Sequence, residues 1–392
     1  MRTRAWIEKR KDRYRVRYYV YENGERLQRS QSFTTAKEAK EFASKVEYQL
    51  DTGQYSYTKG RTLADILNEW LEVYCVHLRP NALADMKTAV RIHIIPYLGN
   101  VPLENVTTGM IQKLYNNMMK REWKPAVYKE INGMRVEVSP AKAYSAKTVR
   151  NVHSALKQAL DQAVRTNLIS RNPCTYVQLP KKESIDYVIP TPEQLGTLLK
   201  ALSEHCTYYP IFICAVLGCR RGEALGLQWQ DIDFQKNTVH IRRAYIYNSL
   251  KQCNEIGELK TKNSKRVLPL PEMLKTELLK LKERNAGICR MLGVEIPYLC
   301  VNEAGQMLTP NLCSHHFHYA AEKTGLNGMR LHDLRHTVVT YMLDAGENPR
   351  TVQEFVGHSD PGFMLRQYAH VLEKSKKQAS DALMRNLFGQ NV

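Results

Sequence analysis

Five residues in the C-terminal half of the chain have side chains that suit the chemistry of a phosphate diester. They are two arginines, two histidines and a tyrosine: Arg220, His332, Arg335, His358 and Tyr368. Guanidinium groups can neutralise the nonbridging oxygens, imidazoles can donate hydrogen bonds, and a phenol can act as a nucleophile. The set therefore favours phosphoryl transfer, although each pair of residues alone occurs by chance in many chains.

Short spacings bring some of these side chains together. Glu223 follows Arg220 by three residues, so its carboxylate shares a helical face with the guanidinium group and can orient it. His332 and Arg335 are also three apart, and one helical turn presents both to one point. The alternative is structural: both arginines could stabilise the fold, and Glu223 could be only a fold-stabilising partner.

Other kinds of chemical site lack their motifs. The cluster His315-His316-Phe317-His318 has no cysteine or carboxylate at metal-ligand spacing, which favours a polar helix surface. The chain contains no GxxxxGK[ST] phosphate loop and no GxSxG elbow. We therefore expect neither a metal nor a nucleotide cofactor.

In their order and spacing, the phosphate-directed motifs resemble the signature of the tyrosine recombinases, the phage-integrase family. His358 follows Arg335 by 23 residues, and Tyr368 follows His358 by 10. The segment Lys260-Thr261-Lys262-Asn263-Ser264-Lys265-Arg266, followed by Leu268-Pro269-Leu270-Pro271, resembles the family's β-hairpin with its catalytic lysine. The overall layout is most similar to integrases of conjugative transposons and related prophages.

The resemblance implies an enzyme that cuts and rejoins DNA, and so integrates and excises a mobile element or prophage. Tyr368 would attack the scissile phosphate, form a 3′-phosphotyrosyl link and free a 5′-hydroxyl. Arg220 and Arg335 would hold the phosphoryl oxygens, and Glu223 would support Arg220.

The remaining roles also follow from the resemblance. His332 and His358 would complete the phosphate pocket, and Lys260 would protonate the leaving 5′-oxygen, with Lys262 as the rival for that role. No cofactor is implied, because the covalent bond conserves the energy of the cleaved linkage. Partners would be core-site and arm-site double-stranded DNA, three further protomers in a homo-tetramer on a Holliday junction, and a small directionality factor. Residues 371–392 would form a tail that docks on a neighbouring protomer.

The charge of the chain agrees with a nucleic-acid partner. Its 392 residues include 57 Lys and Arg against 39 Asp and Glu, a formal charge of +18. A basic enzyme without a polyanionic partner is the alternative. The charged N-terminus does not have the pattern of a signal peptide, and we expect no membrane span. The nine cysteines are scattered and form no CxxC pair, which indicates a reducing cytoplasm, that of a bacterial host.

Residues 1–55 are expected to form an arm-type DNA-binding domain. Arg13, Arg15 and Arg17 alternate with aromatic and aliphatic residues, which predicts a strand with one basic face. Asn23-Gly24 predicts a hairpin turn, and a helix of about 15 residues follows Thr34 and Thr35. Ten Lys and Arg against four acids in residues 1–31 favour contact with a DNA groove over a solvated face.

Residues 62–175 are expected to form a helical, SAM-like core-binding domain. Apolar spacing predicts four helices over about 62–74, 82–94, 107–120 and 145–168, and residues 62–115 resemble the family's core-binding domain. Lys147 and Arg150 lie away from the apolar stripe of the last helix, where they could contact phosphates or face solvent. Alternating residues around Asn132-Gly133 predict a protruding β-hairpin over 127–138, for which we expect a protomer contact.

Residues 185–392 are expected to form the catalytic domain. Thr191-Pro192-Glu193-Gln194 begins a helix, helices predominate, and strands at 238–241 and 266–268 flank a basic loop. The predicted fold class is therefore multidomain α+β: a three-stranded sheet with a helix, a four-helix domain with a hairpin insertion, and a mostly helical domain with a small sheet.

Two other functions fit part of the pattern. A type IB topoisomerase uses similar chemistry, but the N-terminal domain and the compact catalytic domain argue against it. A DNA-binding regulator without catalysis would not need the complete set of site residues. Tyr319 and Tyr341, near the motifs, lie in apolar patterns, so we expect them in the core rather than as nucleophiles.

Overall fold

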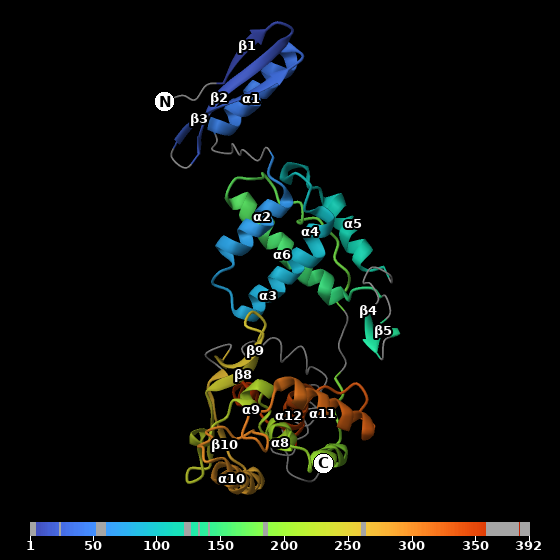
Figure 1. The fold of residues 1–392 in the computed structure, drawn as a ribbon, viewed down its shortest axis with the longest axis vertical. Helices are drawn as coiled ribbons and strands as arrows, with labels where there is room; N and C mark the ends of the chain where they lie inside the picture. Colours follow the sequence, from blue (N-terminus) through green and yellow to red (C-terminus); the bar gives the residue numbers. More distant parts are fainter. Residues whose placement is uncertain are drawn as a thin grey trace. The chain divides into compact units, whose positions relative to one another are not determined.

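The computed structural model describes residues 5–22, 25–51, 60–120, 127–131, 134–139, 142–182, 187–259, 264–357 and 384. The chain divides into two compact units, Met1–Ser184 and Ile185–Val392 (Figure 1). Lys260, Lys262, His358, Tyr368 and, apart from residue 384, the predicted tail lie outside the described residues. Within the described ranges, none of the helices combines the length and the apolar run that a membrane crossing requires.

The N-terminal segment folds into an antiparallel three-stranded sheet with one helix across it (Figure 1). Its elements are β1 (Trp6–Arg10), β2 (Arg13–Glu22), β3 (Glu25–Phe33) and α1 (Ala36–Asp51). The predicted alternation in β2 is confirmed, because Val16, Tyr18 and Val20 are buried against α1 while Arg13, Arg15 and Arg17 alternate with the inward positions and lie on the other face. The predicted turn at 23–24 lies outside the described residues, between the paired Glu22 and Glu25.

The helices that follow share one apolar cluster. They are α2 (Leu63–Glu69), α3 (Pro80–Thr88), α4 (Ile95–Leu98), α5 (Thr108–Met118) and α6 (Ala146–Arg165), with π-helical turns at Trp70–Tyr74 and Ala89–Ile94 and a 3-10 turn at Leu103–Asn105. Thr62 and Asp65 form the capping box that starts α2. The predicted hairpin is present as β4 (Val127–Ile131) and β5 (Met134–Ser139), between α5 and α6.

The second unit is mostly helical. Its helices are α7 (Pro192–Leu202), α8 (Tyr208–Leu217), α9 (Arg221–Leu225), α10 (Glu272–Leu292), α11 (Pro310–Lys323), α12 (Asp333–Asp344) and α13 (Pro349–Val356). Thr191 and Gln194 form the capping box that begins α7, and Pro192 occupies its first turn, as the sequence predicts. α8 lies in the middle of the apolar cluster, with Ile211 fully buried.

Two small sheets complete the second unit. β6 (Ile232–Asp233), β7 (Thr238–Ile241) and β10 (Arg266–Pro269) form an antiparallel sheet in the order β10-β7-β6. The segment between β7 and β10, expected to be a basic loop, contains a hairpin that the sequence analysis missed: β8 (Arg243–Asn248) paired with β9 (Cys253–Glu258).

The two tyrosines expected in the core differ in burial. Tyr319 on α11 is 53% exposed and has Lys323 Nζ 4.5 Å from its ring centroid, so that prediction is wrong. Tyr341 on α12 is half-buried, and its hydroxyl donates to the Pro190 carbonyl at 2.6 Å.

Candidate active site

The turn between α8 and α9 positions the first site arginine. α8 ends at Leu217 and is capped by Gly218, whose φ of +56° is left-handed; a Cβ there would lie 3.1 Å from both Val338 and Val356. Arg220 follows in an extended conformation as the N-cap of α9. Its side chain is about one-third exposed, with a relative exposure of 35%.

Glu223 orients Arg220 by accepting hydrogen bonds from both its backbone and its side chain. Its Oε2 accepts the Arg220 backbone N–H at 3.0 Å, and its Oε1 accepts Arg220 Nη1 at 2.6 Å. The sequence predicts two residues on one helical face, whereas Arg220 stands at the cap and Glu223 at the third helical position. The carboxylate is only 2% exposed, so the pair is held away from water on one side.

A second arginine, Arg266, shares the same carboxylate. Its Nη2 donates to Glu223 Oε2 at 3.0 Å. Burial alone would raise the pKa of Glu223, but Arg266 and Arg220 together hold that pKa below its ordinary value. Arg266 is not among the site residues predicted from the sequence motifs. One signal could have found it: Arg266 begins β10, a strand with buried positions, and a buried charge needs a partner of opposite charge.

Arg335 brings α12 to the same place. Its side chain is 1% exposed and its Nη1 donates to the Gly218 carbonyl at 2.8 Å. Burial and then the nearby Arg220 lower the pKa of Arg335 to about 9, which still leaves it protonated at neutral pH.

His332 precedes α12 as its N-cap residue. Burial, Arg335 and Arg220, in that order, lower the pKa of His332, so its imidazole is neutral at pH 7. A neutral imidazole has one N–H donor and one acceptor nitrogen.

An aromatic chain supports His332 from behind. The ring of His336 lies edge-on to that of His332 with centroids 5.4 Å apart, and it packs on Tyr187 with centroids 3.8 Å apart. The guanidinium group of Arg330 lies over the Tyr187 ring, 5.6 Å from its centroid. Its Nη2 also pairs with a carboxylate oxygen of Asp333 at 2.9 Å. These contacts fix the start of α12, where His332 and Arg335 are placed.

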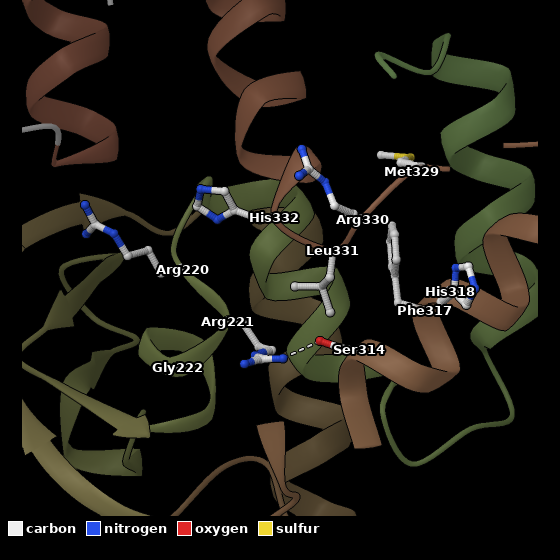
Figure 2. A pocket seen from close by; sticks show the side chains of 10 residues that line it. All are labelled: Arg220, Arg221, Gly222, Ser314, Phe317, His318, Met329, Arg330, Leu331 and His332. Atoms are coloured by element: carbon white, nitrogen blue, oxygen red, sulfur yellow. Dashed lines mark hydrogen bonds between the residues drawn. The ribbon is translucent and has the colours of Figure 1, made fainter. Parts of the chain in front are cut away.

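A pocket of about 530 Å³ adjoins these residues. Figure 2 shows Arg220 and His332 on one side and Phe317 and His318 on the other, with Arg221 reaching toward the Ser314 hydroxyl. Leu331 lies between them, with Arg330 on one side of it and Arg221 on the other (Figure 2). Arg220 and His332 are therefore accessible from one concave surface.

The local charge makes this surface an anion site. Three guanidinium groups, those of Arg220, Arg266 and Arg335, lie around the one carboxylate of Glu223, so positive charge remains after pairing. A phosphate diester carries the negative charge and the two nonbridging oxygens that such a site can bind. The site can therefore hold a phosphate and stabilise the charge that develops on it.

The histidines of α11 have other partners. His316 Nδ1 lies 3.1 Å from the Thr207 hydroxyl, and His318 Nε2 lies 3.3 Å from a Glu322 oxygen. In the part of the chain that the structure describes, no group of three His, Cys, Asp or Glu side chains could hold a metal ion.

Comparison with known proteins identifies the chain. The phage integrase family matches residues 189–375, a range that contains every predicted catalytic residue. The SAM-like N-terminal domain of phage integrases matches residues 62–119. The chain belongs to the phage integrase family of tyrosine recombinases. The recombinase fold predicted from the motifs is thus confirmed.

Relatives and solved structures extend along most of the recombinase. The tyrosine recombinase XerC-like protein of Caldanaerobacter subterraneus subsp. tengcongensis is 26% identical, covering 96% of this chain and 97% of its own. The Tn1549 transposon integrase, solved with a circular intermediate DNA, is 20% identical with a TM-score of 0.66, covering 83% of this chain and 100% of its own. A lambda integrase tetramer bound to a Holliday junction is 16% identical with a TM-score of 0.54, covering 91% and 96%.

The N-terminal sheet of the recombinase has a basic, aromatic face. Cross-strand pairing places Trp6 opposite Arg17, Glu8 opposite Arg15 and Arg10 opposite Arg13 on that face. Arg17 Nε pairs with Glu8 at 3.2 Å, Arg13 is exposed and Arg15 is half-buried. Tyr19 stacks near Trp6, and Arg26 lies 3.9 Å from the Tyr19 centroid.

The two basic residues predicted on the last helix of the SAM-like domain differ in their surroundings. Lys147 is exposed near the start of α6. Arg150 donates from Nε at 2.9 Å and from Nη2 at 2.6 Å to the Pro180 carbonyl. Arg150 therefore fastens the segment after α6, and a contact of either residue with DNA stays a prediction.

Proposed function

We propose that this recombinase integrates and excises a mobile element by site-specific DNA strand exchange through a 3′-phosphotyrosyl intermediate. The observation that carries the proposal is the convergence of Arg220, His332 and Arg335 on one anion site, with Glu223 fixing Arg220. The element is supported by the likeness in fold to a transposon integrase solved with a circular intermediate DNA.

The chemistry would begin with the Tyr368 hydroxyl attacking the scissile phosphorus. The new bond joins the tyrosine oxygen to phosphorus, the bond to the 5′-oxygen breaks, and Lys260 or Lys262 gives that oxygen its proton. Arg220 and Arg335 neutralise the nonbridging oxygens while negative charge builds on them. His332, neutral at pH 7, donates its N–H to the same phosphate, and His358 completes the set.

Reversal of this step on a second DNA end rejoins the strands. The free 5′-hydroxyl attacks the phosphotyrosine, releases the tyrosine and restores a phosphodiester, so no net phosphodiester bond is lost. Exchange between two duplexes requires four protomers, which agrees with the lambda integrase tetramer on a Holliday junction. The domains at 1–55 and 62–175 would hold arm and core sites, residues 371–392 would dock in trans, and a small directionality factor would select excision.

A nicked suicide duplex that carries the attachment site tests the proposal. The short 5′-hydroxyl fragment diffuses away after cleavage, so the covalent protein–DNA complex accumulates and is counted on a denaturing gel. We expect a complex with the wild-type chain and none with Tyr368→Phe. Arg220→Lys keeps the charge but loses the two-pronged geometry, so we expect intact DNA binding with cleavage slowed roughly 10- to 100-fold.

Two outcomes would refute the mechanism. One is the absence of a complex with the wild-type chain on a duplex that the protein demonstrably binds, which would favour a DNA-binding regulator. The other is a complex that persists in Tyr368→Phe. Relaxation of supercoiled DNA without the attachment site would favour a topoisomerase instead.

A further inference from the structure

Arg266 is a buried cation beside Glu223 and has no role in the chemistry proposed above. It begins β10, and its side chain is 6% exposed, against 35% for Arg220. Its three guanidinium nitrogens all donate to protein acceptors, which leaves the more exposed Arg220 to meet a phosphate that approaches from the pocket. Any effect of Arg266 on catalysis must therefore pass through the groups it contacts.

Each nitrogen of the Arg266 guanidinium has a defined acceptor. Nε donates to the Phe355 carbonyl at 2.8 Å, Nη1 to the Ser264 carbonyl at 3.0 Å and Nη2 to Glu223 Oε2 at 3.0 Å. Three acceptors in three directions suit the planar fork of arginine, and a lysine ammonium cannot reproduce that arrangement. Two of the acceptors are backbone carbonyls, so the guanidinium group is fixed by the main chain.

This placement decides how Glu223 meets Arg220. A free carboxylate binds an arginine through two parallel hydrogen bonds, which would engage two guanidinium nitrogens. Here Oε2 is held by Arg266 and by the Arg220 backbone N–H, which leaves Oε1 to accept Arg220 Nη1 at 2.6 Å. Arg220 Nη2 points elsewhere, donating to the Gly357 carbonyl at 3.2 Å.

Arg220 and Arg266 also contact the same two neighbouring segments. Arg220 reaches the Ser264 hydroxyl at 3.5 Å and the Gly357 carbonyl, while Arg266 holds the carbonyls of Ser264 and Phe355. Arg266 thus fixes the two backbone segments that Arg220 also contacts, and so helps to place Arg220.

We propose that Arg266 is a positioning residue for phosphate binding, which holds Glu223 on Arg220 Nη1 so that Nη2, which donates one N–H to the Gly357 carbonyl, has its other N–H for the scissile phosphate. The inference rests on the proposed function, since it concerns how the same site binds its substrate. Without Arg266, Glu223 could pair with Arg220 through both carboxylate oxygens. That pairing would draw the Arg220 guanidinium group away from the phosphate.

The test compares two suicide duplexes, one with an ordinary scissile phosphate and one with a methylphosphonate at that position. The methyl group replaces a charged nonbridging oxygen, so the transition state needs less help from an arginine. If Arg266 acts through Arg220, a defect in Arg266 matters on the charged phosphate and much less on the neutral one. A residue that only stabilises the fold would affect both substrates alike.

We expect Arg266→Lys to slow single-turnover cleavage of the ordinary duplex by about tenfold or more, and that of the methylphosphonate by less than about threefold. Arg220→Lys should show the same contrast. Arg243→Lys is the matched control: Arg243 also pairs with a buried carboxylate in the same unit, that of Asp231, which contacts neither Arg220 nor Glu223 in the described structure. Arg243→Lys should change both rates by less than about twofold.

Equal losses on both duplexes, or no loss at all, would overturn the proposal. So would additive losses in the double variant Arg220→Lys/Arg266→Lys, because a residue that acts through Arg220 has little left to affect once Arg220 is changed. If Arg266→Lys does not fold, Arg266→Gln serves the same comparison. A wild-type chain that forms no complex on either duplex would contradict the proposed function itself, which keeps the two failures distinct.

Discussion

Glu223→Gln removes the negative charge that both Arg220 and Arg266 contact, while nearly preserving the shape of the side chain. The carboxylate is 2% exposed and accepts three hydrogen bonds of 2.6–3.0 Å, two from Arg220 and one from Arg266. In the variant, one amide oxygen still accepts, but the amide NH₂ faces a guanidinium donor. The two arginines also lose the charge that offsets their mutual repulsion.

The structure indicates a large cost for this change. Removing one partner of a buried ion pair costs roughly 3–5 kcal/mol, and the surviving amide oxygen places the variant near the lower value, about 3 kcal/mol. For a unit of this size, a loss of about 3 kcal/mol lowers the Tm by about 6–12 °C. The control is Glu354→Gln on α13, which is 69% exposed and pairs with the 85% exposed Arg350, and it should change stability by less than about 1 kcal/mol.

The stability difference between wild type and Glu223→Gln should depend on pH. Because the folded-state pKa of Glu223 lies below its ordinary value, its contribution is present above that value and is lost as pH falls through the folded pKa. Urea unfolding of wild type and variant from pH 7 to pH 3 should therefore show a gap that narrows below about pH 4.5. A gap under about 1 kcal/mol at pH 7, or one that stays constant to pH 3, would refute the reasoning.

Three further predictions concern other parts of the chain. Burial, with smaller effects of neighbouring charges, lowers the pKa of His336 to about 4, so the unfolded state binds more protons than the folded state between pH 6.5 and 4. Over that range the free energy of unfolding should fall by about 3 kcal/mol more in wild type than in His336→Phe, in which His332 still contributes. Parallel curves of unfolding free energy against pH for the two proteins would contradict this. Arg13→Ala should reduce the slope of log binding constant against log salt concentration for arm-site DNA by about 0.9. Lys45→Ala on α1, away from the basic face, should leave that slope unchanged. Equal slopes for the two variants would show that Arg13 does not contact the DNA. Deletion of residues 125–141 should leave the affinity of a single protomer for core-site DNA intact and weaken tetramer formation in native gels, and undiminished assembly would exclude a protomer contact by the hairpin.

Local chemistry made several elements predictable. The Thr62/Asp65 and Thr191/Gln194 capping boxes depend on residues three apart, and the buried face of β2 follows from alternation along a single strand. The His332 and Arg335 pair was likewise visible, because one helical turn relates them. The family resemblance then supplied the order in which the separate motifs belong together.

Contacts between distant segments were not predictable in this way. β9 has a glycine, two glutamates and no run of β-branched residues, and the β8–β9 hairpin packs against α9, where Gly222 and Gly226 admit its backbone. Arg266 lies 43 residues from Glu223, so no periodicity connects them. Tyr319 sits in an apolar stretch, yet it occurs on the solvent side of α11 because its neighbours Phe317 and Ala320 take the buried positions.

The apolar cluster of the N-terminal sheet is formed by residues 5–50 alone, and the helices that follow have a separate cluster. A segment whose interior is complete in itself can be exchanged without opening the interior of another. Under the proposed assignment of arm sites to residues 1–55, replacing residues up to 51 with a different small DNA-binding fold should change which arm sites are bound while leaving the cutting chemistry intact. Arm-site binding and strand cleavage could then be altered separately.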